Sequence, residues 1–184
     1  MNRLQSFHEV LIPLLVEAMG VTTYLELGTD QNQTIGKVRC PRRIGVDKAA
    51  ALCEGAIMFS MPIQAFIGEK AGSLAPFQFV FIDADHSAES VGQDFRGIWP
   101  FVEDEGLVVL HDTNPETESD TDPGLCGDAW KFAHDLWLRQ HHDCYESLTL
   151  PYHPGLTLVR KRVSWGPPAK FADGKHTSLT EQGR

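Results

Sequence analysis

Short apolar runs that stop abruptly at glycine, acidic or histidine residues recur along the chain, and this pattern most limits its possible folds. The runs have the length of strands and are rich in β-branched and aromatic residues. They cover residues 22–27, 43–46, 77–82 and 106–110. Segments of helical periodicity lie between several of them, and strands that alternate with helices predict right-handed β-α-β units. We therefore predict an α/β protein with a doubly wound, mostly parallel sheet.

The other segments complete a single Rossmann-like domain over residues 1–162. Ser87 is placed to cap a helix that ends before Pro100, and a further helix is expected at 128–140. We expect strands at 56–61, 147–150 and 156–160, with the final pair supplying a reversed edge strand. Residues 163–184 are rich in glycine, proline and polar residues, which predicts a disordered tail. An N-terminal helix is predicted with an apolar face of Leu4, Phe7, Leu11, Leu14, Leu15 and Ala18.

The composition favours a small-molecule substrate over a nucleic acid or a membrane. A formal net charge of -9 on 184 residues disfavours binding by neutralisation of phosphates. No apolar run approaches the roughly 18 residues needed to span a membrane, and the N-terminal segment lacks the apolar core of a signal peptide. The four cysteines show no metal-binding spacing. These features predict a cytoplasmic protein with reduced thiols, and they leave a homo-oligomer open.

Polar residues gather at one edge of the predicted sheet, where ligands of parallel α/β sheets bind. The spacing of Asp47 from the first turn suits recognition of ribose hydroxyls, although a turn or helix-cap role is the alternative. Gly28 allows the backbone to approach a ligand closely, or serves an ordinary tight turn. The strand ends carry Glu26, Gly28, Asp47, Asp83, Asp85, His86, His111 and Asp112.

The stretch from Asp83 to Ser87 is the most informative part of this edge, because two acids and a histidine directly follow an apolar strand. Asp83 and Asp85 offer oxygen ligands to a divalent cation, and Asp112 can complete the set. A histidine here can instead act as a general base, since its ordinary pKa is about 6.5. A structural role is the third possibility, in which Asp85 and Ser87 cap the next helix and His86 bonds to the backbone.

Four strand-end motifs follow one another along the chain: Tyr24-Leu25-Glu26-Leu27-Gly28-Thr29, Ile44-Gly45-Val46-Asp47, Phe79-Val80-Phe81-Ile82-Asp83-Ala84-Asp85-His86-Ser87 and Gly106-Leu107-Val108-Val109-Leu110-His111-Asp112-Thr113. In this order they resemble the motifs of class I S-adenosylmethionine-dependent methyltransferases. The group with macrocin-type sugar O-methyltransferases and cephalosporin-hydroxylase-like proteins is especially similar, because its members read Phe-Ile-Asp-Gly-Asp-His-Ser and later His-Asp at two of these strand ends. The resemblance covers residues 22–113, and residues 154–161 resemble the terminal strand of that group.

The resemblance implies a cofactor and a reaction. S-adenosylmethionine would lie with its methionine part near Glu26 and Gly28 and its ribose on Asp47, with Thr29 and Asp83 also among the cofactor-binding residues. By analogy with magnesium-dependent members, Asp83 and Asp112 would bind Mg²⁺, with Asp85 as a further metal ligand. Methyl transfer to an oxygen of a small molecule or sugar is the expected reaction. The catalytic residues implied are Asp83, His86 and His111, and a histidine would take the proton.

Two departures from the family pattern keep an alternative open. The family's glycine-rich turn is represented only by Gly28, so Asp30 would lie near the cofactor carboxylate; Asn32 can adopt the left-handed backbone conformation. Thr113 stands where catechol O-methyltransferases hold a metal-ligating asparagine. The alternative is a non-catalytic nucleotide-binding or interaction protein on the same fold. An NAD-dependent oxidoreductase is disfavoured, because the chain lacks a G-x-G-x-x-G turn.

Overall fold

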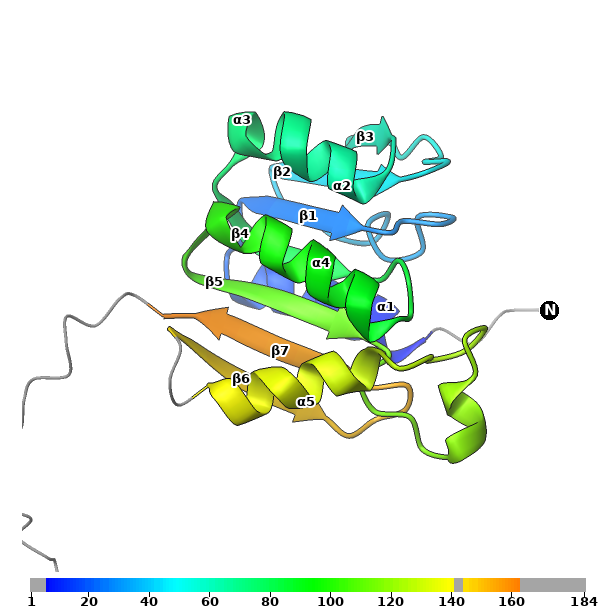
Figure 1. Ribbon diagram of the computed structural model, residues 1–184. Helices are drawn as coiled ribbons and strands as arrows, with labels where there is room; N and C mark the ends of the chain where they lie inside the picture. Colours follow the sequence, from blue (N-terminus) through cyan, green and yellow to red (C-terminus); the bar gives the residue numbers. More distant parts are fainter. Residues whose placement is uncertain (1–5, 141–143, 163–184) are drawn as a thin grey trace, which may run out of the picture.

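The computed structural model describes residues 6–140 and 144–162, and it shows a seven-stranded sheet covered on both faces (Figure 1). Along the sheet the order is β3-β2-β1-β4-β5-β7-β6. The tail expected at 163–184 lies outside the described residues. The strands are β1 (Thr23–Leu27), β2 (Arg42–Asp47), β3 (Ile57–Ser60), β4 (Phe77–Ile82), β5 (Val102–His111), β6 (Tyr145–Leu150) and β7 (Leu156–Lys161).

The sheet is doubly wound and mostly parallel, which confirms the predicted fold class. β1 pairs in parallel with β2 and β4, and the pairs β2–β3 and β4–β5 are also parallel. The reversed strand is β7, which lies between β5 and β6 and runs antiparallel to both. Because the strand order changes direction between β1 and β4, a ligand site is expected beyond the carboxyl ends of these two strands.

Helices cover the sheet from both sides (Figure 1). Helix α1 (Phe7–Ala18) lies behind the sheet, whereas α4 (Ala88–Ile98) and α5 (Ala129–Arg139) lie in front. A helical stretch in front of β2 consists of α2 (Ile63–Phe66), the π-helix Ile67–Ala71 and α3 (Gly72–Leu74). Short 3-10 turns follow at Trp99–Phe101 and Glu118–Thr121. In the part of the chain that the structure describes, no helix has the length and apolar character needed to cross a membrane.

Turns replace a helix on the back of the sheet between β1 and β2. Residues 28–41 form a series of turns, linked by bonds such as Gly36 N–H to the Asn32 carbonyl at 3.0 Å. Ile35 and Val38 from this segment are fully buried in the back core. Complete burial of such a side chain contributes about 1.5–3 kcal/mol. Apolar packing therefore fixes this segment against the sheet without regular helical hydrogen bonding.

The predicted apolar face of α1 is wrong in part, because Leu14 is 56% exposed whereas Ile12 is fully buried. Glu9 lies on the buried side and pairs with Lys37 of the turn segment at 2.5 Å. A buried carboxylate needs a charged or hydrogen-bonding partner. The side of the helix that reaches Lys37 is therefore the side that packs on the sheet. Leu4 lies outside the described residues.

Candidate active site

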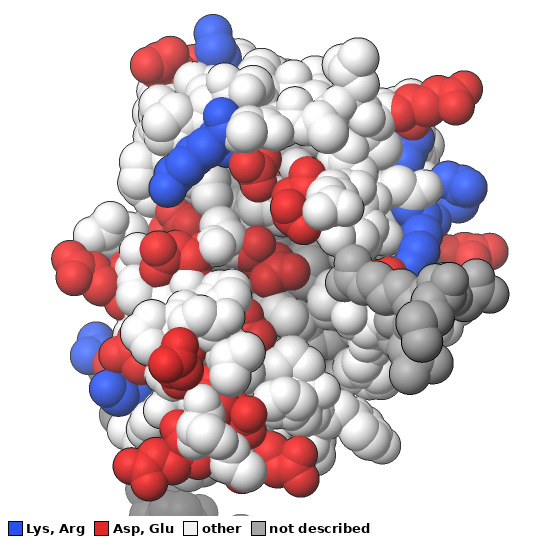
Figure 2. Space-filling view, turned by 90° about the vertical axis from the view of Figure 1, so that its right-hand side faces the viewer, with Lys and Arg blue, Asp and Glu red and all other residues white. Residues whose placement is uncertain are grey.

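A pocket of about 630 Å³ opens beyond the carboxyl ends of β1 and β4; we call it the strand-end pocket. Its volume lies in the range of pockets that bind cofactors and small ligands. Figure 2 faces this edge and shows acidic side chains around a hollow. Among the lining residues, Lys48 is the single lysine or arginine. The residues predicted from the sequence that line this pocket are Glu26, Gly28, Thr29, Asp47, Asp83, Asp85 and His86.

The turn after β1 brings its backbone to the pocket although it holds few glycines. Gly28 has a φ of +89°, Asp30 of +40° and Asn32 of +62°. The left-handed conformation expected for Asn32 is thus confirmed. The Asn32 side-chain amide donates to the carbonyls of Ala51 and Leu52 at 3.3 and 3.2 Å. These bonds stabilise a backbone conformation that side chains other than glycine adopt at some cost.

Asp47 ends β2 and holds the same turn against the sheet. Its Oδ2 accepts hydrogen bonds from the backbone N–H groups of Thr29 and Asp30, both at 3.1 Å. Its Oδ1 accepts one from the N–H of Ala49 at 3.0 Å. A carboxylate offers about four lone-pair sites, so Asp47 keeps capacity for a ligand hydroxyl in the pocket. The structure shows the turn contacts; the ribose role stays a prediction.

Two carboxylates and two histidines meet where β4 and β5 end; we call them the strand-end cluster, which consists of Asp83, His86, His111 and Asp112. His111 Nδ1 lies 3.0 Å from Asp83 Oδ1 and 3.1 Å from Asp112 Oδ2. His86 Nε2 lies 3.3 Å from the same oxygen of Asp112. Asp112 has a φ of +59°, a strained conformation that is common at functional sites. The structure therefore brings these four predicted site residues together.

The carboxylates of the cluster favour the charged form of His111. Burial of the ring acts in the opposite direction, but Asp83 and Asp112 outweigh it and raise the pKa of His111 to about 10. Burial alone would raise the pKa of Asp83, and the charge of His111 reverses this, so that the pKa is lowered. Without a metal ion, one imidazolium between two carboxylates thus balances part of the charge of the cluster.

Asp85 makes its contacts outside the strand-end cluster. Its Oδ1 accepts a hydrogen bond from the N–H of Ser87 at 2.9 Å, and the Ser87 hydroxyl accepts one from the N–H of Ser90 at the start of α4. These are the contacts expected if Asp85 and Ser87 cap the helix that follows. The backbone carbonyl of His86 accepts a bond from the N–H of Asp128 at 3.0 Å, which joins this stretch to the start of α5. A role of Asp85 as a metal ligand stays a prediction.

A second, smaller pocket of about 340 Å³ lies on the other side of the cluster; we call it the loop pocket. Segments that follow β5 and β6 complete its walls. Since Asp83 and His86 line both pockets, the cluster forms the boundary between them. The loop pocket is lined by the four cluster residues and by Asp120, Gly124, Leu125, Cys126, His153 and Pro154.

Sequence reasoning missed His8, which lines the strand-end pocket from α1. Its ring lies 4.3 Å from that of His111, measured between centroids, in an edge-to-face arrangement. The connection from α1 to β1 is short, so the helix has to run antiparallel to the strand and begin at its carboxyl end. The short connection is thus the sequence signal from which the position of the first turn of α1 at the site could have been predicted.

Glu26 sits at the inner wall of the strand-end pocket and is only 2% exposed. It accepts a hydrogen bond from the Tyr24 hydroxyl. Burial, aided by the charge of Asp83, raises the pKa of Glu26 from 4.5 to about 8 against the effect of the Tyr24 bond. The neutral carboxyl therefore stabilises the fold fully below pH 4.5, and this contribution is lost as the pH rises toward 8.

We expect Glu26→Gln, which cannot ionise, to gain stability relative to the wild type as the pH rises from about 5 to about 8.5. The gain should reach roughly 1–4 kcal/mol, because one unit of pKa shift corresponds to about 1.4 kcal/mol. Urea unfolding at several pH values measures it. Glu54→Gln, at an exposed position, is the control and should show a constant difference. A constant difference for Glu26→Gln as well would contradict the raised pKa.

Comparison with known proteins shows similarity to methyltransferases. Residues 26–113 match the model of a methyltransferase domain. The O-methyltransferase from Bacillus cereus in complex with SAH is 16% identical with a TM-score of 0.63, over 88% of this chain and 83% of that chain. The O-methyltransferase TomG from Streptomyces achromogenes, in complex with SAM, is 16% identical with a TM-score of 0.64, over 88% and 82%. No match was found among curated proteins.

A third similar structure is the MycE methyltransferase from the mycinamycin biosynthetic pathway, in complex with Mg, SAH and mycinamycin VI. It is 18% identical with a TM-score of 0.60, over 90% of this chain and 53% of that chain. Similarity at these identities shows a common fold, and the family match begins within the first strand-end motif, at Glu26, and covers the other three. The prediction from these motifs is thereby confirmed: residues 26–113 match a methyltransferase domain, and the chain has the fold of O-methyltransferases of known structure.

Proposed function

We propose that the protein transfers the methyl group of S-adenosylmethionine to a hydroxyl oxygen of a small molecule or sugar. The boundary between the two pockets carries this proposal, since Asp83 and His86 line both of them. The strand-end pocket would hold the cofactor, and the loop pocket would hold the acceptor. The two reactants would then meet at the strand-end cluster. Methyl transfer depends chiefly on such an alignment of the reacting atoms.

The charge of the strand-end pocket supports this choice of cofactor. S-adenosylmethionine carries a sulfonium and an ammonium group, which acidic walls attract. The diphosphate of NAD would be repelled by the same walls, with Lys48 alone to oppose the repulsion. This argues against the oxidoreductase reading. The acidic residues of the pocket are Asp30, Asp47, Asp83, Asp85 and Asp94, together with Glu26, whose raised pKa keeps it mostly neutral at pH 7.

Two side chains of the pocket wall fit a ligand that bears hydroxyl groups. Asp47 has unused acceptor capacity toward the pocket and would hold the ribose. The hydroxyl of Thr29 is buried and has no hydrogen-bond partner among the described residues. Native proteins rarely leave such groups unsatisfied. A bound cofactor would give Thr29 a partner.

The cluster also fits a divalent ion held by the carboxylates of Asp83 and Asp112, whose ligand atoms lie within 4.8 Å of each other and of His86. Such an ion would lower the pKa of the acceptor hydroxyl and orient its oxygen. The oxygen forms its bond to the methyl carbon as the carbon–sulfur bond breaks, and S-adenosylhomocysteine leaves. His86 would accept the hydroxyl proton, because it is 33% exposed and borders both pockets.

We expect Asp47→Ala to weaken S-adenosylmethionine binding about 10- to 100-fold, since hydrogen bonds to a charged group contribute about 1.5–3 kcal/mol. Calorimetric titration with S-adenosylmethionine, S-adenosylhomocysteine and NAD, with and without Mg²⁺, measures it. Asp104→Ala is the matched control, because this exposed acid lies near the amino end of β5. It should leave the affinity unchanged.

Each outcome of this titration bears on the proposal. Selective binding of the two adenosyl ligands, weakened by Asp47→Ala alone, would support the cofactor site. Failure of both ligands to bind under every condition would contradict the proposed reaction. Tight binding without methyl transfer to any of a panel of hydroxyl compounds would favour the non-catalytic alternative.

A further inference from the structure

Three side chains from separate elements converge beside the strand-end cluster. They are His8 of α1, Asp83 after β4 and His111 at the end of β5, and one ligand atom from each lies within 4.8 Å of the others. His8 precedes the segment 26–113 that matches the methyltransferase domain. The match to the domain model therefore does not include His8.

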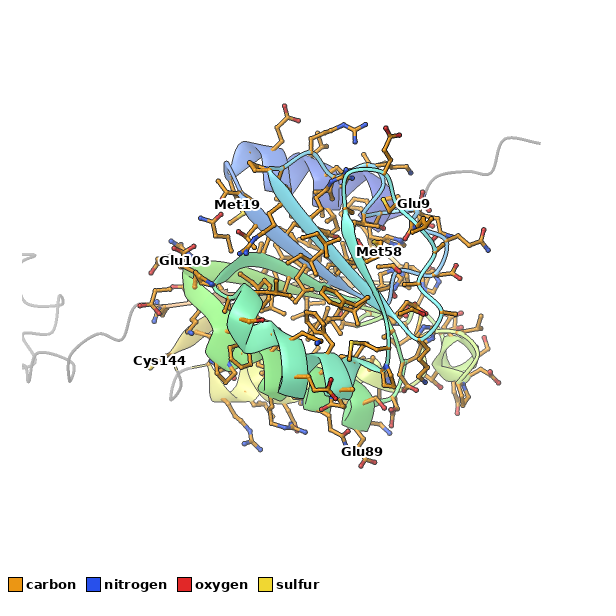
Figure 3. The ribbon with its side chains drawn as sticks, turned by 90° about the horizontal axis from the view of Figure 1, so that it is seen from above. Glu9, Met19, Met58, Glu89, Glu103 and Cys144 are labelled. Atoms are coloured by element: carbon orange, nitrogen blue, oxygen red, sulfur yellow. The ribbon has the colours of Figure 1, made fainter. Side chains whose placement is uncertain are left out.

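The direction of α1 explains why His8 is there. Figure 3 shows Glu9, in the first turn of α1, at the same end of the molecule as Glu89, in the first turn of α4. Met19, which follows α1, lies at the opposite end. The pair of the buried Glu9 with the half-buried Lys37 fixes the rotation of the helix next to His8. The histidine is thus held at the carboxyl end of the sheet by the packing of α1.

Several ring nitrogens at this place lack a partner. His8 Nδ1, His86 Nδ1 and both ring nitrogens of His111 are buried, and none has a hydrogen-bond partner among the described residues. An unsatisfied buried polar atom costs about 1–3 kcal/mol, so four together are unusual in a native protein. Imidazole nitrogens beside carboxylates are ligands for a metal ion, which would supply the absent interaction.

The ligand atoms, nitrogen or oxygen, determine which metal ion the site prefers. Mg²⁺ favours oxygen ligands, whereas imidazole nitrogen favours ions such as Zn²⁺, Fe²⁺ and Co²⁺. Two histidines and one carboxylate form a ligand set that leaves coordination positions open for a further molecule. We infer that this chain binds a divalent transition metal ion through His8, Asp83 and His111, in preference to Mg²⁺.

The observed separations suit one ion at this position. Metal bonds of about 2.1 Å put neighbouring ligand atoms about 3.0–3.4 Å apart. The contact of His111 with Asp83 is 3.0 Å, and ligand atoms of His8, Asp83 and His111 all lie within 4.8 Å of one another. Asp112 and His86 would border the ion on the side of the loop pocket. Only the use of the ion in methyl transfer rests on the proposed function; its binding does not.

Cobalt(II) is a suitable probe, because its visible absorption reports nitrogen ligands directly. We expect the full-length protein, freed of metal by a chelator, to bind one Co²⁺ per chain and to keep it in a roughly 1,000-fold excess of Mg²⁺. His8→Phe retains a ring against Phe81 and His111 but offers no nitrogen. It should weaken Co²⁺ binding at least about tenfold.

His134→Phe is the matched control, because His134 is exposed and stacks on Trp137 away from the cluster. It should bind Co²⁺ like the wild type, and circular dichroism checks that both variants are folded. Absent Co²⁺ absorption, displacement by Mg²⁺, or unchanged binding by folded His8→Phe would overturn the inference. S-adenosylmethionine binding is titrated separately without Co²⁺. If S-adenosylmethionine binds but Co²⁺ does not, only the metal inference is contradicted. If Co²⁺ binds but S-adenosylmethionine does not, only the proposed function is contradicted.

Discussion

Gly28→Ala is expected to destabilise the protein by at least about 3 kcal/mol. A Cβ at this position would lie 2.1 Å from the backbone oxygen of Asp83 and 2.7 Å from Cα of Ala84. Both are main-chain atoms, so they cannot move aside without shifting the end of β4. The φ of +89° adds a further cost of roughly 1 kcal/mol for a residue with a side chain. Urea unfolding measures the loss.

Gly20→Ala separates the two contributions. Gly20 also has a positive φ, +63°, but a Cβ there would meet nothing within 4 Å. This variant should therefore lose only the conformational part, about 1 kcal/mol. Equal losses for the two variants would contradict the close approach between the turn after β1 and the end of β4. That approach brings the turn that we propose to bind the cofactor next to Asp83, so Gly28→Ala should also abolish S-adenosylmethionine binding.

The strands and the residues at their ends could be predicted because each buried strand leaves a continuous apolar run. The expected strand 77–82 coincides with β4 (Phe77–Ile82). β5 begins earlier than expected, at Val102, because Glu103, Asp104 and Glu105 conceal its first residues. At that end only Val102 pairs with Phe77, and the register shifts before Leu107 pairs with Phe79. A hydrophobicity pattern therefore does not detect the polar residues at the solvated end of a strand as part of that strand.

Contacts of single side chains could not be predicted in the same way. The exposure of Leu14 and the position of His8 depend on the rotation of α1, which a pair between Glu9 and Lys37 sets across 28 positions of sequence. Helical periodicity alone does not encode such a pair. The position of Asp85 has a local explanation, because its carboxylate accepts a hydrogen bond from the N–H of Ser87 two residues later. The sequence leaves this contact open as an alternative to metal binding.

Asp83→Asn should lower the rate of methyl transfer at least about 100-fold, within the range found when a positioned charged group is removed from an active site. The carboxylate of Asp83 borders both pockets and contacts His111 at 3.0 Å. Its neutral amide would bind a divalent ion more weakly and would leave His111 with Asp112 alone. Initial rates of S-adenosylhomocysteine release with a hydroxyl acceptor measure the change.

Asp85→Asn is the matched control, because it makes the same chemical change two positions away on the wall of the same pocket. The amide oxygen of asparagine can still accept the bond from the N–H of Ser87, so the start of α4 should be preserved. We expect a loss of less than about fivefold, since Asp85 lies outside the groups of potential metal ligands among the described residues. Similar losses for both variants would show that Asp83 and Asp85 act as a pair. The reaction centre would then lie in the strand-end pocket, and the cluster with His111 and Asp112 would have a structural role.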